Sequence, residues 1–83
     1  MDRDAIVDRL VEAERQVIDG ERHLRRQREL VARFQRSGSD SAFAHKVLAQ
    51  LEELQTQRIA NRDRLRAAMS GGSEKWTNIG ELN

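Results

Sequence analysis

Apolar residues recur at alternating steps of three and four along two long segments of this chain, and this spacing constrains the fold more than any other feature. In the first segment one column of a seven-residue frame holds Leu10, Val17, Leu24 and Val31. The matching column of the second segment holds Ala44, Leu51, Arg58 and Leu65. Such a stripe is typical of helices packed at a shallow angle, whereas a half-buried strand would alternate at every second residue. The pattern therefore predicts an all-α protein with coiled-coil-like packing.

A short polar turn separates the two segments. Gly38 suits the left-handed position just after a helix, and Ser39 or Asp40 can cap the helix that follows. We expect a helix over 2–36, a turn over 37–40 and a helix over 40–69. Because so short a connection makes neighbouring helices antiparallel, residues 1–69 should form one antiparallel two-helix hairpin.

The same frame predicts which residues meet between the helices. Folding about the turn sets Leu24 against Leu54 and Gly20 against Arg58. A glycine inside a helix costs about 1 kcal/mol relative to alanine. The gap at Gly20 would let the stem of Arg58 cross to water or to an acid such as Asp19 or Glu21; the alternative is that Gly20 is simply tolerated. The predicted hairpin seam comprises Leu10, Ala13, Val17, Gly20, Leu24, Val31, Val47, Leu51, Leu54, Arg58 and Leu65.

A lone hairpin leaves half of each apolar stripe uncovered, so we expect two copies to pair as a homodimer in a four-helix bundle. Beside the seam, one flank carries six apolar residues, most of them in a strip near the end remote from the turn. This candidate dimer or partner face comprises Val7, Val11, Ile18, Leu48, Ile59 and Met69. The alternative is that these are ordinary isolated apolar residues on a protein surface.

Arginine is concentrated in the second half of the first helix. The 83-residue chain has 15 Lys+Arg against 14 Asp+Glu, so no overall basic footprint marks it as a nucleic-acid binder. The candidate phosphate contacts are the outward Arg22, Arg26, Arg33 and Arg36. Only Phe34 could stack a base among them, so we favour a solvated, ion-paired face over RNA or DNA binding.

No arrangement typical of catalysis is visible. The chain has no cysteine, and its two histidines, His23 and His45, fall too far apart along the hairpin to share a metal. Asp19 and His23 have a spacing that can bind metal, but a solvated pair is the commoner meaning. We expect no enzyme activity, no cofactor and no metal. No apolar run reaches the ~18–20 residues of a membrane span, so we expect a cytoplasmic protein without membrane contact.

Residues 70–83 read as a flexible tail, because Ser70-Gly71-Gly72-Ser73 ends the helical pattern. Trp76, Ile79 and Leu82 recur every three residues and are candidate tail anchors. As anchors they would dock the segment onto the bundle or onto a neighbouring chain. The alternatives are that the segment is a disordered chain end, or that it consists of residues from an added linker.

Several stretches carry a resemblance over roughly residues 8–68. They are Ala13-Glu14-Arg15-Gln16-Val17, Gly20-Glu21-Arg22-His23-Leu24, Arg26-Gln27-Arg28-Glu29-Leu30-Val31, Leu51-Glu52-Glu53-Leu54-Gln55 and Asn61-Arg62-Asp63-Arg64-Leu65. In these stretches the chain resembles a group of short, mostly uncharacterised bacterial helical-hairpin proteins. The resemblance implies the hairpin and no activity or ligand.

The sequence is thus interpreted as a small non-catalytic protein–protein interaction or regulatory module that acts by helical-bundle self-association. The alternatives are an Arg-rich-helix RNA- or DNA-binding protein, and a subunit that completes a bundle with a different protein.

Overall fold

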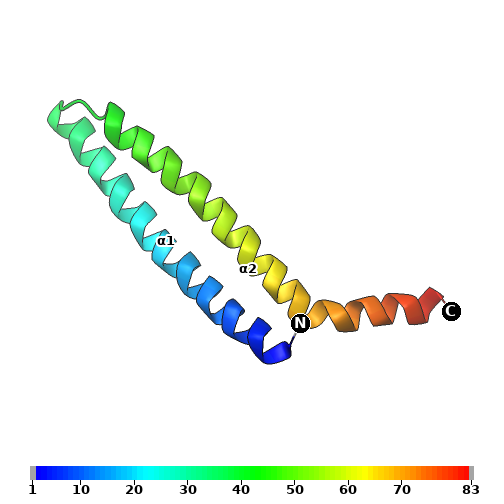
Figure 1. Cartoon of the computed structure of the whole chain (residues 1–83). Coiled ribbons are helices and arrows are strands. Elements are labelled where there is room, and N and C mark those ends of the chain that lie inside the picture. Colours follow the sequence, from blue (N-terminus) through cyan, green and yellow to red (C-terminus); the bar gives the residue numbers. More distant parts are fainter. Residues whose placement is uncertain (1, 83) are drawn as a thin grey trace.

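Two helices make up the part of the chain that the structure describes. The computed structural model describes the backbone of residues 2–82 and the side chains of residues 2–70. The two helices are α1 (Arg3–Ser37) and α2 (Ala42–Leu82), and they pack against each other as an antiparallel hairpin (Figure 1). The described backbone contains no strand, so the prediction of an all-α helical hairpin is confirmed.

The turn is built as the sequence indicates. Gly38 has φ 75° and ψ 9°, the left-handed conformation, and its N–H donates to the Gln35 carbonyl. Asp40 then accepts a hydrogen bond of 2.9 Å from the Ala42 N–H, which satisfies one of the free donors at the start of α2. Because Asp40 is used in this way, α2 begins two residues later than expected.

The far end of α2 differs from the expectation. The sequence predicts a helix ending at Met69, whereas α2 continues to Leu82 in the described backbone. The side chains of residues 71–83 lie outside the described residues, and so do the candidate anchors Trp76, Ile79 and Leu82. The docking of this segment therefore stays a prediction.

The seam on α1 follows the predicted frame. Its buried residues are Ala13, Val17, Gly20, Leu24 and Val31. Leu10, Gln27 and Phe34 continue the same stripe and are partly exposed. The alternating steps of three and four therefore identify the buried face of this helix along its whole length.

The seam on α2 is rotated from the predicted one. Leu54 is 39% exposed, so the prediction that it is buried against Leu24 in the hairpin is wrong. The neighbouring Gln55 is buried instead, at 5% exposure. The column that faces α1 consists of Ala44, Leu48, Leu51, Gln55, Arg58, Arg62, Leu65 and Met69, each buried or partly buried. Val47 stays partly buried at the edge of the seam.

A hydrogen bond across the seam explains the rotation. The Gln55 side-chain Nε2 donates to the Val17 carbonyl at 2.8 Å, so a side chain of α2 is bonded to the backbone of α1. The Gln55 amide reaches it by lying over Gly20, where a Cβ atom would overlap Gln55 Oε1. The predicted proximity of Gly20 and Arg58 is found as well, since Arg58 Nη1 lies 3.0 Å from the same Cβ position. No ion pair joins Arg58 to Asp19 or Glu21 within the described residues.

A second glutamine crosses the seam nearer the turn. The Gln27 Nε2 donates to the Ala44 carbonyl at 2.9 Å. Both crossings tie a side chain of one helix to the backbone of the other, so they fix how far the helices are shifted along each other.

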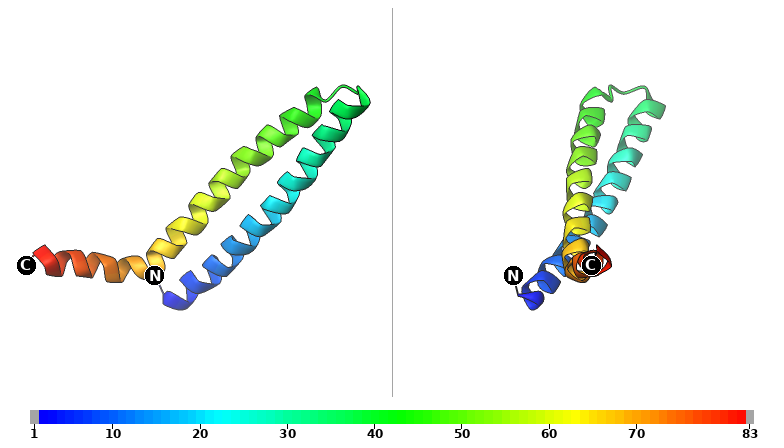
Figure 2. Two further views of the ribbon diagram at one scale, coloured as in Figure 1. Left: turned by 180° about the vertical axis from the view of Figure 1, so that it is seen from behind. Right: turned by 90° about the vertical axis from the view of Figure 1, so that its right-hand side faces the viewer.

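The core between the helices is thin. The least exposed side chains are those of Ala13 and Val17, at 2% and 3%, and no large side chain among the described residues is shielded completely. Figure 2 shows why: up to residue 70 the hairpin is a single layer of two helices, with no third helix over either face. Pairing into a four-helix bundle lies beyond one chain and remains a prediction.

Candidate protein-association surface

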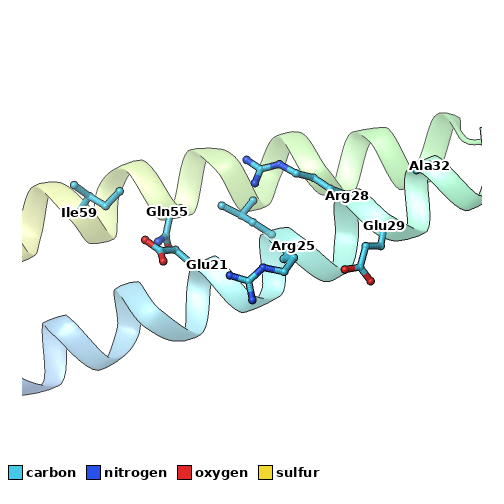
Figure 3. A pocket seen from close by; sticks show the side chains of 8 residues that line it. Glu21, Arg25, Arg28, Glu29, Ala32, Gln55 and Ile59 are labelled. Carbon is cyan, nitrogen blue, oxygen red and sulfur yellow. The ribbon is translucent and has the colours of Figure 1, made fainter.

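Two adjoining hollows lie on one flank of the hairpin. The larger has a volume of about 590 Å³, and Leu24, Ala32 and Ile59 are its apolar lining residues. Figure 3 shows that its lining side chains come from both helices. The smaller, of about 260 Å³, is lined by Val17, Ile18 and four charged residues. Glu21 lines both, so we treat them as one flank groove.

The candidate partner face coincides with this groove in part. Ile18 and Ile59 line it, and Val11 lies two helical turns before Ile18 on the same side of α1. Val11 and Ile18 are each 53% exposed, which is high for residues of this kind in the middle of a helix. Val7 is partly exposed one turn earlier. An apolar strip therefore runs from the groove toward the start of α1.

Two members of the predicted face lie elsewhere. Leu48 and Met69 belong to the α2 column that packs against α1, and both are partly buried there. The rotation of α2 that brings Gln55 into the seam also carries Leu48 and Met69 toward it. Their assignment to the outer face is therefore corrected.

Ion pairs join the two helices along the groove. Arg66 Nη2 lies 3.0 Å from Glu14 Oε2, and Arg28 Nη2 lies 3.8 Å from Glu52 Oε2. Each side chain is 41–58% exposed, so solvent screens both pairs and each contributes little to stability. Arg25 has no acidic partner among the described residues, although it lines the same groove.

The sequence interpretation missed an exposed apolar residue away from the groove. Phe43 is 77% exposed in the first turn of α2. The polar residues Gln50 and Gln57 follow it at heptad spacing, so they lie on the same side of α2. Their polarity indicates that this side faces solvent. The corrected Leu54 lies next to that side, because the rotation of α2 turns it away from α1.

The four candidate phosphate contacts are all exposed. Arg22 lies 3.9 Å from Asp19 in a solvated ion pair. Arg26, Arg33 and Arg36 have no acidic partner within residues 2–70. These three side chains lie on the outer side of α1, in the half nearer the turn.

Nothing in the described residues forms a metal centre. No cluster of three or more His, Asp or Glu side chains is found there. The His45 ring instead bonds to the Gln35 amide of α1 at 3.3 Å and to the Ser41 carbonyl at 3.0 Å. His23 is exposed on α1. Within the same region neither helix has a stretch long and apolar enough to cross a bilayer.

Comparison of the chain with protein-family models, with curated proteins and with solved structures finds no match. The resemblance to short bacterial hairpin proteins therefore stays a prediction.

Proposed function

We propose that this protein is a small, non-catalytic interaction module that acts by pairing with a second copy through its flank groove. The observation that carries the proposal is the unfinished core. Leu24 and Val17 belong to the buried seam, yet both also line the open groove. A hairpin with its core residues at the bottom of a groove gains stability when another helical layer covers it.

The surface around the groove supports the same conclusion. Val11 and Ile18 are each 53% exposed beside it. Burying a fully exposed side chain of this size contributes ~1.5–3 kcal/mol, and each of these two is about half exposed, so pairing can add roughly half of that value for each. We propose that the module works in the cytoplasm.

Static light scattering after size-exclusion chromatography tests the proposal. The expected mass is twice the 9.6 kDa of one chain. Replacing Val11 and Ile59 by Asp should reduce it to a single chain, because the new carboxylates would lose water on pairing. Phe43→Asp is the matched control: it removes an exposed apolar residue away from the groove and should leave the mass unchanged. A wild-type chain that scatters as a monomer at every concentration would exclude self-association and favour a bundle with a different protein.

One observation favours a second function, binding to the phosphates of RNA or DNA. Arg26, Arg33 and Arg36 have no acidic partner in the described part of the chain. If they contact phosphates, affinity should fall steeply with salt, and replacing Arg22, Arg26 and Arg33 by Gln should weaken it. We rank this function second, and expect no binding tighter than non-specific at physiological salt. Salt-sensitive nanomolar binding would reverse the ranking.

A further inference from the structure

We infer that the second copy docks with its turn at the same end as the first, so that α1 of each copy packs on α2 of the other. This inference rests on the proposed self-association and adds its geometry. The two-fold axis then runs along the bundle, and both copies use the same surface, as a two-fold interface requires.

The position of the exposed apolar residues decides the direction. On the groove flank Val11 lies toward the end of the hairpin remote from the turn, and Ile18 lies just before the midpoint of α1. Ile59 lies in the half of α2 that runs beside them. Same-end docking brings the Ile18 of one copy toward the Ile59 of the other, and buries both apolar ends together.

Docking with the turns at opposite ends has no equivalent solution. Full overlap would set Val11 against the turn half of the second copy's α1, where Arg25 and Arg28 line the groove, whereas Ile18 would meet the middle of that helix. Shifting the copies so that only the apolar ends overlap would leave the larger hollow, at Leu24 and Ala32, uncovered in both. Only the same-end arrangement covers the strip and the whole groove.

Charge agrees with pairing between α1 and α2. Residues 2–19 carry six acids and three arginines, whereas residues 58–70 carry four arginines and one acid. Within one chain this polarity already places Arg66 of α2 beside Glu14 of α1. A second copy in the same-end arrangement repeats the acidic-to-basic match across the interface, where Arg25 still lacks a partner among the described residues.

Distances between spin labels test the inference, because the chain has no cysteine of its own. A single label is placed at Arg36→Cys near the turn, and in a second protein at Asp8→Cys near the other end; both residues are exposed. Same-end docking predicts label-to-label distances of roughly 20–30 Å at both sites, about two helix diameters. Full overlap with opposite ends predicts about 50 Å at Arg36, since α1 has 35 residues at about 1.5 Å each.

Light scattering on the same labelled samples separates the two proposals. A dimer with short distances at both sites supports the inference. A dimer whose Arg36 distance is about 50 Å or more overturns the docking direction and leaves the proposed self-association in place. A labelled and an unlabelled chain that both remain monomeric overturn the proposed function and the inference together.

Discussion

At Gly20 of α1 there is no room for a side chain, because the Gln55 amide of α2 lies over it. Alanine normally stabilises a helix interior by about 1 kcal/mol relative to glycine. At this site the new Cβ would overlap Gln55 Oε1, and the Gln55 amide cannot turn away without losing its bond to the Val17 carbonyl. Losing a buried hydrogen bond costs about 1–3 kcal/mol. We therefore expect Gly20→Ala to lower the free energy of unfolding by up to ~2 kcal/mol, measured by urea denaturation. In a Gln55→Ala background the same change should raise stability, and a loss of equal size there would remove Gln55 from the explanation.

Two leucines at mid-hairpin should respond very differently to truncation. Leu24 is 7% exposed and Leu54 is 39% exposed. Leu24→Ala should cost ~2–5 kcal/mol, toward the lower end because the groove beside it lets the site relax. Leu54→Ala should cost less than half as much, since its side chain already meets water. Urea unfolding of both variants at one protein concentration compares the two changes. Equal losses of unfolding free energy would indicate that Leu54 is buried as Leu24 is.

At the level of the helices, α1 could be predicted almost completely and α2 only in part. The buried column of α1 is apolar or glycine at Ala13, Val17, Gly20 and Leu24, so the hydrophobic spacing identifies it. On α2 the buried column includes Gln55, whereas the apolar Leu54 is exposed. Hydrophobic spacing cannot predict that exchange, because it depends on a hydrogen bond to the backbone of the other helix.

The candidate site shows the same division. Ile18 and Ile59 line the groove, and Val11 lies on the same side of α1 as Ile18. These positions agree with the predicted flank because two of them belong to α1, and a small rotation of α2 does not carry Ile59 off that flank. Leu48 and Met69 were misplaced because they lie in the column that the rotation turns inward. Sequence periodicity alone therefore predicts on which flank a residue lies. How deeply its side chain is buried follows only from the packed structure of the two helices.

The turn between the helices depends on one backbone conformation. Gly38 has φ 75°, and a Cβ atom there would have no neighbour within 4 Å. Gly38→Ala should thus destabilise the hairpin by backbone strain alone, by roughly 1 kcal/mol. Gly38→Asn should cost less, because asparagine tolerates the left-handed region better. Thermal unfolding followed by circular dichroism measures both, and a Gly38→Ala protein as stable as the wild type would show that the turn adopts another conformation.

For the whole molecule, we expect the stability of the fold to depend on association with a second copy. The hairpin is a single layer whose core residues Val17 and Leu24 also line an open groove. If a second copy covers that groove, folding is linked to pairing, and the unfolding midpoint should rise with protein concentration. Ile18→Asp should remove this dependence as well as lower the midpoint, whereas Phe43→Asp should keep it, because Phe43 lies away from the groove. Calorimetry over a hundredfold range of concentration makes the measurement. A midpoint that stays constant for the wild-type chain would mean that the two helices are stable without a second layer, and that the exposed Val11 and Ile18 have no role in pairing.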